Sequence, residues 1–454
     1  MIGKKFLALA ALVCALPLQA LAETPASLAT LKGLAPVSAL PATAAGRAAL
    51  AANYAVTGGI QTGALHQPTL LPFAEQQQQA LRDAFITGGN LADLADGLGT
   101  TLGAAYQARA HYVDREHFTS LSRSVAELIA YANMSSAVDS NAAKYFFANG
   151  TTDGKTPVSA EALAIFKEVG GSPDVFGKQY GRPAGSADAD AYGNSRPFQT
   201  EPTVTRITGY DYFHAPSDNT VYNRGPVMNL IDSPSYPSGH TTYGYMGSVL
   251  LAVLVPERYQ QMVTRGAEYG NDRILMGSHY AMDVLGGRAL ALYTLAHLLA
   301  NDPSYMGRSL GRAPVINDFQ AAVRQARADM VAALQAGCGN TLAICATEDI
   351  GRFGNPASNA AFYTATQTYG LPTVHAKTAA EGEDVGKVAP EAGYLLTMAF
   401  PSLSLEQANR ILTETQGPGG GFLDDGSGFG VYSRLSLFAA AGRAAALTRI
   451  EAKQ

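Results

Sequence analysis

The chain has 454 residues, of which 47% are hydrophobic and 15% charged, and its formal net charge is −5. Because this charge is small and no long acidic or basic run concentrates it, we expect neither nucleic acid nor an anionic membrane surface as the main partner. No apolar stretch beyond the N-terminal segment is long enough to cross a bilayer, which indicates a soluble globular protein without stable membrane insertion.

The N-terminus has the pattern of a secretory signal peptide. Lys4 and Lys5 precede an apolar run over residues 6–21, and a small-x-small cleavage site ends at Ala22. The run is shorter than the roughly 20 residues of a membrane-spanning helix, so we expect residues 1–22 to be removed rather than kept as an anchor. Loss of the two lysines takes the formal charge from −5 to −7. A periplasmic or secreted location follows.

Most of the remaining chain shows helical periodicity. Apolar residues recur at steps of three and four in segments rich in Ala, Leu, Gln, Glu and Arg. The clearest of these segments span residues 75–96, 122–149, 317–334 and 404–415. Alternating strand-like runs are scarce, so the predicted class is mainly α, and the helix from residue 317 is expected to stop at Gly337.

Residues 170–225 have a different composition. They are rich in Gly, Pro, Ser, Asp and Asn and show few helical patterns. Long irregular stretches in compact proteins are often functional loops, so we expect this segment to lie near a site.

The tetrapeptide Pro237-Ser238-Gly239-His240 marks a predicted helix start, because apolar residues follow it at helical spacing. The free N–H groups and the positive dipole end at such a start form a cradle for an anion beside Ser238 and His240. Taken alone, the triplet Ser238-Gly239-His240 is more typical of a capped helix that carries an exposed histidine.

A second cluster comprises Arg273, His279 and Asp283. The histidine and the aspartate are four residues apart, so in a helix they share one face. The carboxylate could then hold one imidazole nitrogen and fix the tautomer that leaves the other nitrogen free to attack. An isolated pair of this kind is more often a surface pair, and its meaning depends on the arginine and on the earlier tetrapeptide.

Cys338 and Cys345 are the two cysteines that follow the signal segment. In an oxidising compartment two such close cysteines form one local disulfide. Two free thiols are the alternative, and two cysteines alone do not complete a zinc site.

The two clusters together resemble the type 2 phosphatidic acid phosphatase superfamily, which also contains the bacterial class A acid phosphatases and the vanadium haloperoxidases. Residues 237–240 match its second motif, and Arg273, His279 and Asp283 match its third motif in type and spacing. The serine that usually precedes the arginine of the third motif is Asp272 here.

The first motif of that family reads Lys, six residues, Arg-Pro, and this chain departs from it. Arg196 and Pro197 supply the Arg-Pro, but Ala189 stands at the lysine position. Lys178 is the weak candidate for the missing lysine, and Arg182 is a weaker alternative to Arg196.

The resemblance implies a helical bundle of the phosphatidic acid phosphatase and vanadium haloperoxidase type, with loop-rich insertions. It would occupy residues 23–336, with the motifs inside residues 178–300. Residues 337–454 would form a C-terminal extension that packs on the same core or caps the site. The length agrees with one large domain plus an extension, since 454 residues exceed the usual size of a single core.

The resemblance also implies a secreted, metal-independent phosphate-monoester hydrolase of the acid phosphatase type. His279, oriented by Asp283, would attack phosphorus and form a phosphohistidine, while His240 would protonate the leaving group. No cofactor is needed, and a small soluble phosphomonoester is the expected substrate. The groups expected to hold the phosphate oxygens are Arg196, Arg273, the Ser238 hydroxyl and the Gly239 N–H.

Three alternatives stay open at this point. A vanadium-dependent haloperoxidase would hold vanadate through His279. A metal-dependent hydrolase would use His214, His240, His279 and Asp283 as ligands, although no HExxH or aspartate-pair spacing supports it. A non-catalytic anion-binding envelope protein would keep the phosphate site without turnover. The sequence does not indicate an oligomeric state.

Overall fold

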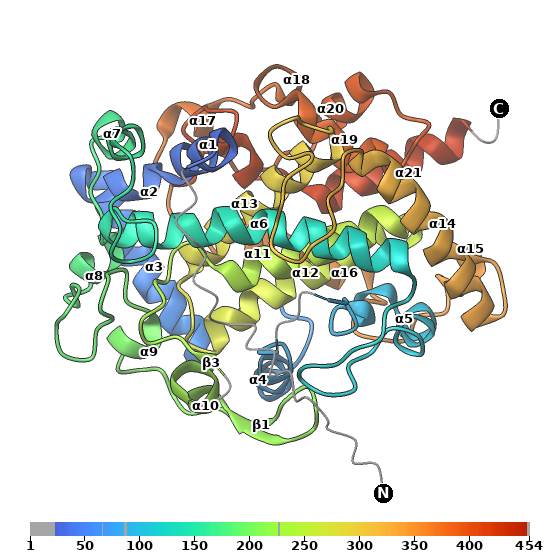
Figure 1. The fold of residues 1–454 in the computed structure, drawn as a ribbon, viewed down its shortest axis with the longest axis horizontal. Coiled ribbons are helices and arrows are strands. Elements are labelled where there is room, and N and C mark those ends of the chain that lie inside the picture. The colour runs from blue at the N-terminus through green and yellow to red at the C-terminus, as the bar shows by residue number, and fades with distance from the viewer. Residues whose placement is uncertain (1–22, 66, 86–88, 226–227, 452–454) are drawn as a thin grey trace, which may run out of the picture.

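Helices account for most of the chain in the computed structural model, which describes residues 23–65, 67–85, 89–225 and 228–451 (Figure 1). The predicted mainly α class is confirmed. The predicted signal peptide, residues 1–22, lies outside the described residues. A short antiparallel pair of strands, β1 and β2, lies at the lower edge of Figure 1, with Thr208 opposite Asp218.

The elements before the second motif are, with η for a 3-10 helix, α1 (Pro25–Leu34), α2 (Pro36–Ala39), η1 (Leu40–Ala42), α3 (Ala44–Thr62), α4 (Phe73–Arg82), η2 (Ala95–Leu98), α5 (Thr100–Gln107), α6 (Arg123–Asn149), α7 (Ala160–Val169), α8 (Val175–Gln179), α9 (Pro197–Thr200), β1 (Thr208–Tyr210), β2 (Pro216–Asp218), α10 (Asn219–Arg224) and β3 (Met228–Asn229). The elements from the second motif onward are α11 (Gly239–Leu254), η3 (Pro256–Arg258), α12 (Tyr259–Leu275), α13 (Ala281–Leu299), α14 (Phe319–Cys338), α15 (Leu342–Cys345), α16 (Pro356–Thr368), α17 (Ala376–Ala380), α18 (Val385–Val388), η4 (Pro390–Gly393), α19 (Tyr394–Thr397), α20 (Leu405–Glu414), η5 (Gly430–Ser433) and α21 (Leu437–Glu451). Residues 170–225 hold only short elements, as their composition predicts.

The three helices that carry the motifs form the centre of the molecule. Every residue of α11 except Tyr243 is buried, and so is every residue of α13 except Tyr293 and His297. Helix α12 packs against both. A helix that is apolar on all its sides is stable only when other elements surround it, so the remaining helices form a shell around these three.

The shell includes the long helix α6 and the C-terminal segment. Helix α6 crosses the middle of the view in Figure 1 and packs on α11, α13 and α14. Helices α16 and α21 pack on α12, so the segment after residue 336 shares one core with the motif helices. Arg288 in α13 strengthens this link, because its buried guanidinium donates to the Leu435 carbonyl at 2.9 Å and to the Tyr363 hydroxyl at 3.2 Å.

Two of the predicted helix boundaries are wrong. The helix predicted for residues 75–96 ends at Arg82, because the next residue, Asp83, turns its carboxylate to the buried guanidinium of Arg265 at 2.6 and 2.7 Å. Helix α14 continues past Gly337, where a Cβ atom would lie 2.8 Å from that of Ala105. Its last residue is Cys338, and the C-cap residue Gly339 adopts a left-handed φ of 73°.

Cys338 and Cys345 are joined by a disulfide with a Cα–Cα distance of 6.3 Å. The bond connects the last residue of α14 to the last residue of α15. It therefore closes the turn that begins the C-terminal extension.

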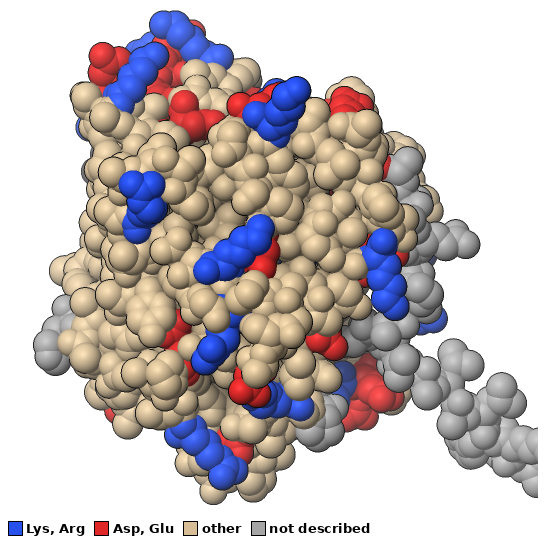
Figure 2. All heavy atoms as spheres, turned by 90° about the vertical axis from the view of Figure 1, so that its left-hand side faces the viewer, with Lys and Arg blue, Asp and Glu red and all other residues tan. Residues whose placement is uncertain are grey.

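The surface carries mixed charge. Figure 2 shows one face of the molecule, on which basic and acidic side chains lie beside one another and most of the surface is uncharged. Within the described ranges, no helix combines the length and the hydropathy that a membrane span needs.

Substitution of Gly287 in α13 tests the close packing of the central helices. A Cβ atom there would lie 2.5 Å from the carbonyl oxygen of Ser238, so backbone would have to move. We expect Gly287→Ala to lower the free energy of unfolding by about 1–3 kcal/mol, as overpacking does. Urea unfolding followed by circular dichroism measures the change.

Gly58→Ala in α3 is the matched control, because its nearest atom beyond the helix would be 3.8 Å away. This helical glycine has room for a methyl group, so we expect a gain of roughly 0.5–1 kcal/mol. Stabilisation by both substitutions would contradict the close approach of α13 to the start of α11.

Candidate active site

The second motif forms the start of helix α11. Ser238 is the N-cap, and its Oγ accepts a hydrogen bond from the Thr241 N–H at 3.1 Å. The Ser238 N–H donates to the Asp283 carbonyl at 3.0 Å, which ties this start to α13. Gly239 is the first helical residue, so its N–H has no partner within the helix. His240 follows with 7% of its surface exposed.

The third motif forms the turn between α12 and α13. Arg273 lies in the last turn of α12, and its carbonyl accepts from the N–H groups of Ser278 and His279 at 3.1 and 3.2 Å. Gly277 adopts a φ of 71°, a conformation that favours glycine, so the chain can reverse there. His279 is thereby placed next to the end of α12 and is fully buried.

His279 and Asp283 meet, but the predicted reason is wrong. His279 precedes α13, whose N-cap is Tyr280, so the two residues do not share a helical face. Asp283 is the third helical residue, and its Oδ2 turns back to accept from the Tyr280 N–H at 2.8 Å. The same oxygen lies 3.4 Å from His279 Nδ1 and also accepts from the Ser235 hydroxyl.

Arg196 reaches the histidine from α9. Pro197 begins this short helix, and the Phe198 N–H donates to the Gly277 carbonyl at 2.9 Å, which anchors α9 to the turn before His279. Arg196 Nη1 lies 3.0 Å from His279 Nε2. A guanidinium can only donate, so Nε2 holds the lone pair and Nδ1 carries the proton that faces Asp283.

Burial sets the charge state of the two histidines. Burial, and next the charge of Arg196, lower the pKa of His279 well below its usual value. Burial, and next the charge of Arg273, do the same to the pKa of His240. Burial also raises the pKa of Asp283 to about 6. At neutral pH the free protein therefore holds two neutral imidazoles, with ring centroids 5.9 Å apart, beside an ionised carboxylate.

The two arginines are fully buried and bonded only to neutral groups. Arg196 donates to backbone carbonyls, the Ser233 hydroxyl and His279, and Arg273 donates to the Ala80 carbonyl at 3.2 Å. Arg273 Nε and Nη1 have no hydrogen-bond partner. Among the described residues, no carboxylate lies within ion-pair distance of either guanidinium. Buried cations without a counter-ion are suited to bind an anion.

The structure brings together most of the predicted site residues and leaves two apart. His240, His279, Asp283, Arg196 and Arg273 form one buried cluster, with Ser238 and Gly239 at its edge.

The weak candidates Lys178 and Arg182 do not belong to this cluster. Both side chains are exposed, and Lys178 Nζ donates to the Pro173 carbonyl at 2.7 Å. The structure therefore does not bring Lys178 to the cluster, because α8 directs this side chain to the surface. His214, a ligand in the metal alternative, is exposed as well.

Two residues of the cluster were not predicted from the sequence. The Tyr222 hydroxyl in α10 bonds to His240 Nε2. Lys144 in α6 has 7% of its surface exposed and is one of the charges that lower the pKa of both histidines. A lysine within the apolar stretch 142–148 of a predicted helix is the sequence signal that could have identified it.

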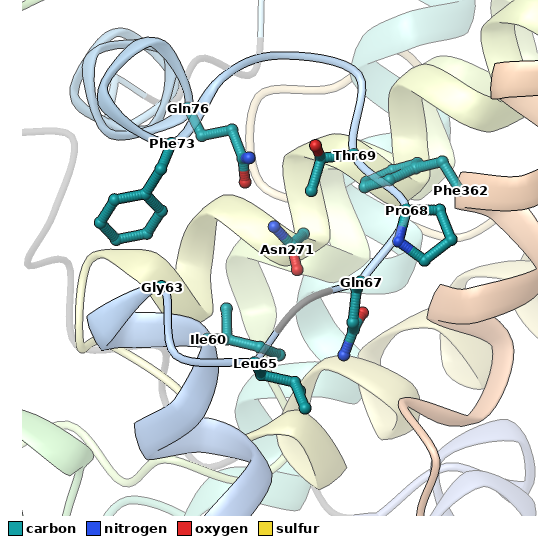
Figure 3. A pocket seen from close by; sticks show the side chains of 10 residues that line it. All are labelled: Ile60, Gly63, Leu65, Gln67, Pro68, Thr69, Phe73, Gln76, Asn271 and Phe362. Atoms are coloured by element: carbon teal, nitrogen blue, oxygen red, sulfur yellow. The ribbon is translucent and has the colours of Figure 1, made fainter.

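A pocket of about 210 Å³ lies close to α12 but is separate from this cluster (Figure 3). Its lining includes Phe73 and Gln76 of α4, Asn271 of α12 and Phe362 of α16. Asn271 and Arg273 are two residues apart, which is about 200° around a helix, so they point to opposite sides of α12. The pocket therefore does not contain the predicted phosphate groups.

Part of the chain that contains the cluster is similar to known proteins. Residues 185–303 match the profile described as the PAP2 superfamily. The chain is 42% identical over 64 residues to the non-specific acid phosphatase of Salmonella typhimurium and 41% identical over 64 residues to the acid phosphatase of Zymomonas mobilis. It is 27% identical over 144 residues to the non-specific acid phosphatase of Providencia stuartii.

These similarities cover parts of each protein. The Salmonella typhimurium match takes in 14% of this chain and 26% of the relative, and the Zymomonas mobilis match takes in 14% and 24%. The Providencia stuartii match takes in 29% of this chain and 56% of the relative. Arg196, His240, His279 and Asp283 all lie within the profile match. Residues 185–303, which hold both buried histidines, are therefore similar to the PAP2 superfamily, and the chain spans about a quarter to about half of the length of the acid phosphatases that it matches.

Proposed function

We propose that this protein is a periplasmic or secreted phosphate-monoester hydrolase of the acid phosphatase type that acts through a phosphohistidine intermediate. The observation that carries the proposal is the contact between Arg196 Nη1 and His279 Nε2 at 3.0 Å. In this contact the lone pair of the neutral His279 imidazole points toward the buried Arg196 guanidinium, which lacks a counter-ion. The names of the relatives, all acid phosphatases, support the same reaction.

Substrate binding uses the unpaired donors of the cluster. A phosphoryl group that enters between the histidines would receive hydrogen bonds from the unpartnered Nε and Nη1 of Arg273 and from the Gly239 N–H. Arg196 would add a hydrogen bond when its Nη1 leaves His279 Nε2 for a phosphoryl oxygen. The same donors would neutralise the charge that spreads over the equatorial oxygens in the transition state.

The first chemical step forms a bond between His279 Nε2 and phosphorus and breaks the bond from phosphorus to the ester oxygen. The Nδ1–H of His279 donates to Asp283, which stabilises the positive charge that develops on the ring. His240 gives a proton to the departing ester oxygen. The products of this step are the alcohol and a phosphohistidine.

The second step uses water. The neutral His240 takes a proton from a water molecule, the resulting hydroxide attacks phosphorus, and the N–P bond breaks. Phosphate leaves, His279 regains its lone pair and His240 is protonated again. Proton transfer and charge neutralisation by side chains of this chain complete the cycle, so the proposed mechanism needs no metal or organic cofactor.

The Tyr222 hydroxyl bonds to Nε2 of His240, the nitrogen that donates the proton in the proposed mechanism. The ester oxygen of a substrate must therefore replace this hydroxyl before it can receive the proton. The negative charge of the phosphoryl group would oppose the effect of Arg273 and raise the pKa of His240. We expect small soluble monoesters as substrates, because the polar groups of this buried site lie close enough together to surround one phosphoryl group.

Hydrolysis of p-nitrophenyl phosphate in excess chelator tests the reaction. We expect turnover by the mature protein, a loss of at least about 1,000-fold in kcat for His279→Ala, and a loss of about 100- to 10,000-fold for His240→Ala. His117→Ala is the control, because this histidine is exposed and bonds only to Asp114.

Full activity of the His279→Ala variant would refute the phosphohistidine intermediate. Sensitivity to chelator would favour the metal-dependent alternative. If the intact protein shows no turnover, bromide oxidation by peroxide after vanadate loading would identify a haloperoxidase. Phosphate binding without either activity would identify an anion-binding protein.

The pH dependence of kcat/KM tests the role of the carboxylate, and that of kcat tests the role of the proton donor. The pKa of Asp283 is raised to about 6, so below this pH the carboxyl group is protonated and no longer accepts from His279. We expect kcat/KM to fall as the pH drops below about 6. We expect kcat, which reports the complex in which the phosphoryl group raises the pKa of His240, to fall on the alkaline side as His240 loses its proton. A profile that is flat from acid to alkali would contradict the two-histidine assignment.

A further inference from the structure

The position that normally holds a lysine in the first motif holds Ala189 in this chain. The nearby Lys178 is exposed and bonds to the Pro173 carbonyl, so it does not take over this role. The motif segment therefore supplies one cation, Arg196, where the family pattern has two. A further cation on this side of the site would therefore come from another part of the fold.

Lys144 is brought to this place by helix α6. Its Nζ donates to the Pro234 carbonyl at 2.9 Å, and Arg196 Nη2 donates to the same oxygen at 3.2 Å. Because the two cations share one acceptor, the ammonium lies beside the guanidinium that contacts His279.

The stem of Lys144 also lies against the start of α11. Its Cε atom is 3.4 Å from the point where a Cβ of Gly239 would be, and Ser140 Oγ is 3.3 Å from the same point. Ser140 is buried, and its hydroxyl has no hydrogen-bond partner. The ammonium and this hydroxyl thus border the helix end whose N–H we expect to face the phosphate.

The amino group of Lys144 has no acidic partner in the free protein. Within the described part of the chain, no carboxylate lies within ion-pair distance of its Nζ, and burial together with the charge of Arg196 lowers its pKa. A buried ammonium is costly unless it is paired. An anion bound between Arg196 and Gly239 would provide that pair.

We propose that Lys144 supplies the cation that the first motif lacks and binds an oxygen of the phosphoryl group on the Gly239 side of the site. The inference rests on the proposed function, because it takes the phosphoryl group as the ligand. Lys144 acts in substrate binding and in stabilising the transition state, and it comes from a helix outside the segment that matches the family profile.

The binding of inorganic phosphate, measured by isothermal titration calorimetry on the mature protein, tests this role. Lys144→Met keeps the volume of the stem and removes the charge, and the Pro234 carbonyl keeps its bond from Arg196. We expect the Kd of phosphate to rise about 10- to 100-fold, the loss of one charge-assisted hydrogen bond, and KM for p-nitrophenyl phosphate to rise with it. Lys178→Met, the exposed lysine, should leave both unchanged.

Lys144→Gln separates charge from structure. A glutamine amide can still donate to the Pro234 carbonyl, so a structural lysine would be replaced with little loss, whereas a phosphate-binding lysine would not. Phosphate affinity within twofold of the wild type in either folded variant, or unfolding of both variants, would overturn the inference. Phosphate binding is independent of turnover, so the role of Lys144 and the proposed hydrolysis can fail separately.

Discussion

The hydrogen bond from the Arg196 guanidinium to His279 Nε2 is the contact on which the arrangement of the buried cluster depends. A guanidinium has no acceptor, so the imidazole must offer its lone pair on that side and its proton on the other. Asp283 occupies the other side. The tautomer of His279 is therefore fixed by two neighbours of opposite charge, and each of these neighbours is held in place by a different helix start.

Keeping such groups out of water requires a rigid frame. Buried cations with only neutral partners are unfavourable by themselves, and the apolar packing of α11, α12 and α13 compensates for that cost. The C-terminal extension adds to the frame by packing on α12 and by accepting the hydrogen bonds of Arg288. Donors that are already desolvated and oriented need no rearrangement when charge develops on a substrate.

The sequence predicted the helical class and most members of the cluster, because the motif residues differ in type from the apolar stretches around them. It placed His279 and Asp283 together for the wrong reason, since a capping turn and a shared helical face give the same spacing of four. Lys144 was out of reach of this reasoning. Motif spacing describes residues on one segment, whereas the contact between Lys144 and the start of α11 depends on how α6 packs against it.

The direction of the pKa shifts connects the binding of substrate to its cleavage. Burial and the arginine charges lower the pKa values of Lys144, His240 and His279 together. In the proposed mechanism a phosphate dianion acts in the opposite direction on all three groups, so substrate binding draws protons into the site. His240 then acquires the proton that it must donate when the ester oxygen is next to it. In the proposed mechanism His240 is therefore neutral in the free protein and charged in the complex, where its proton is needed.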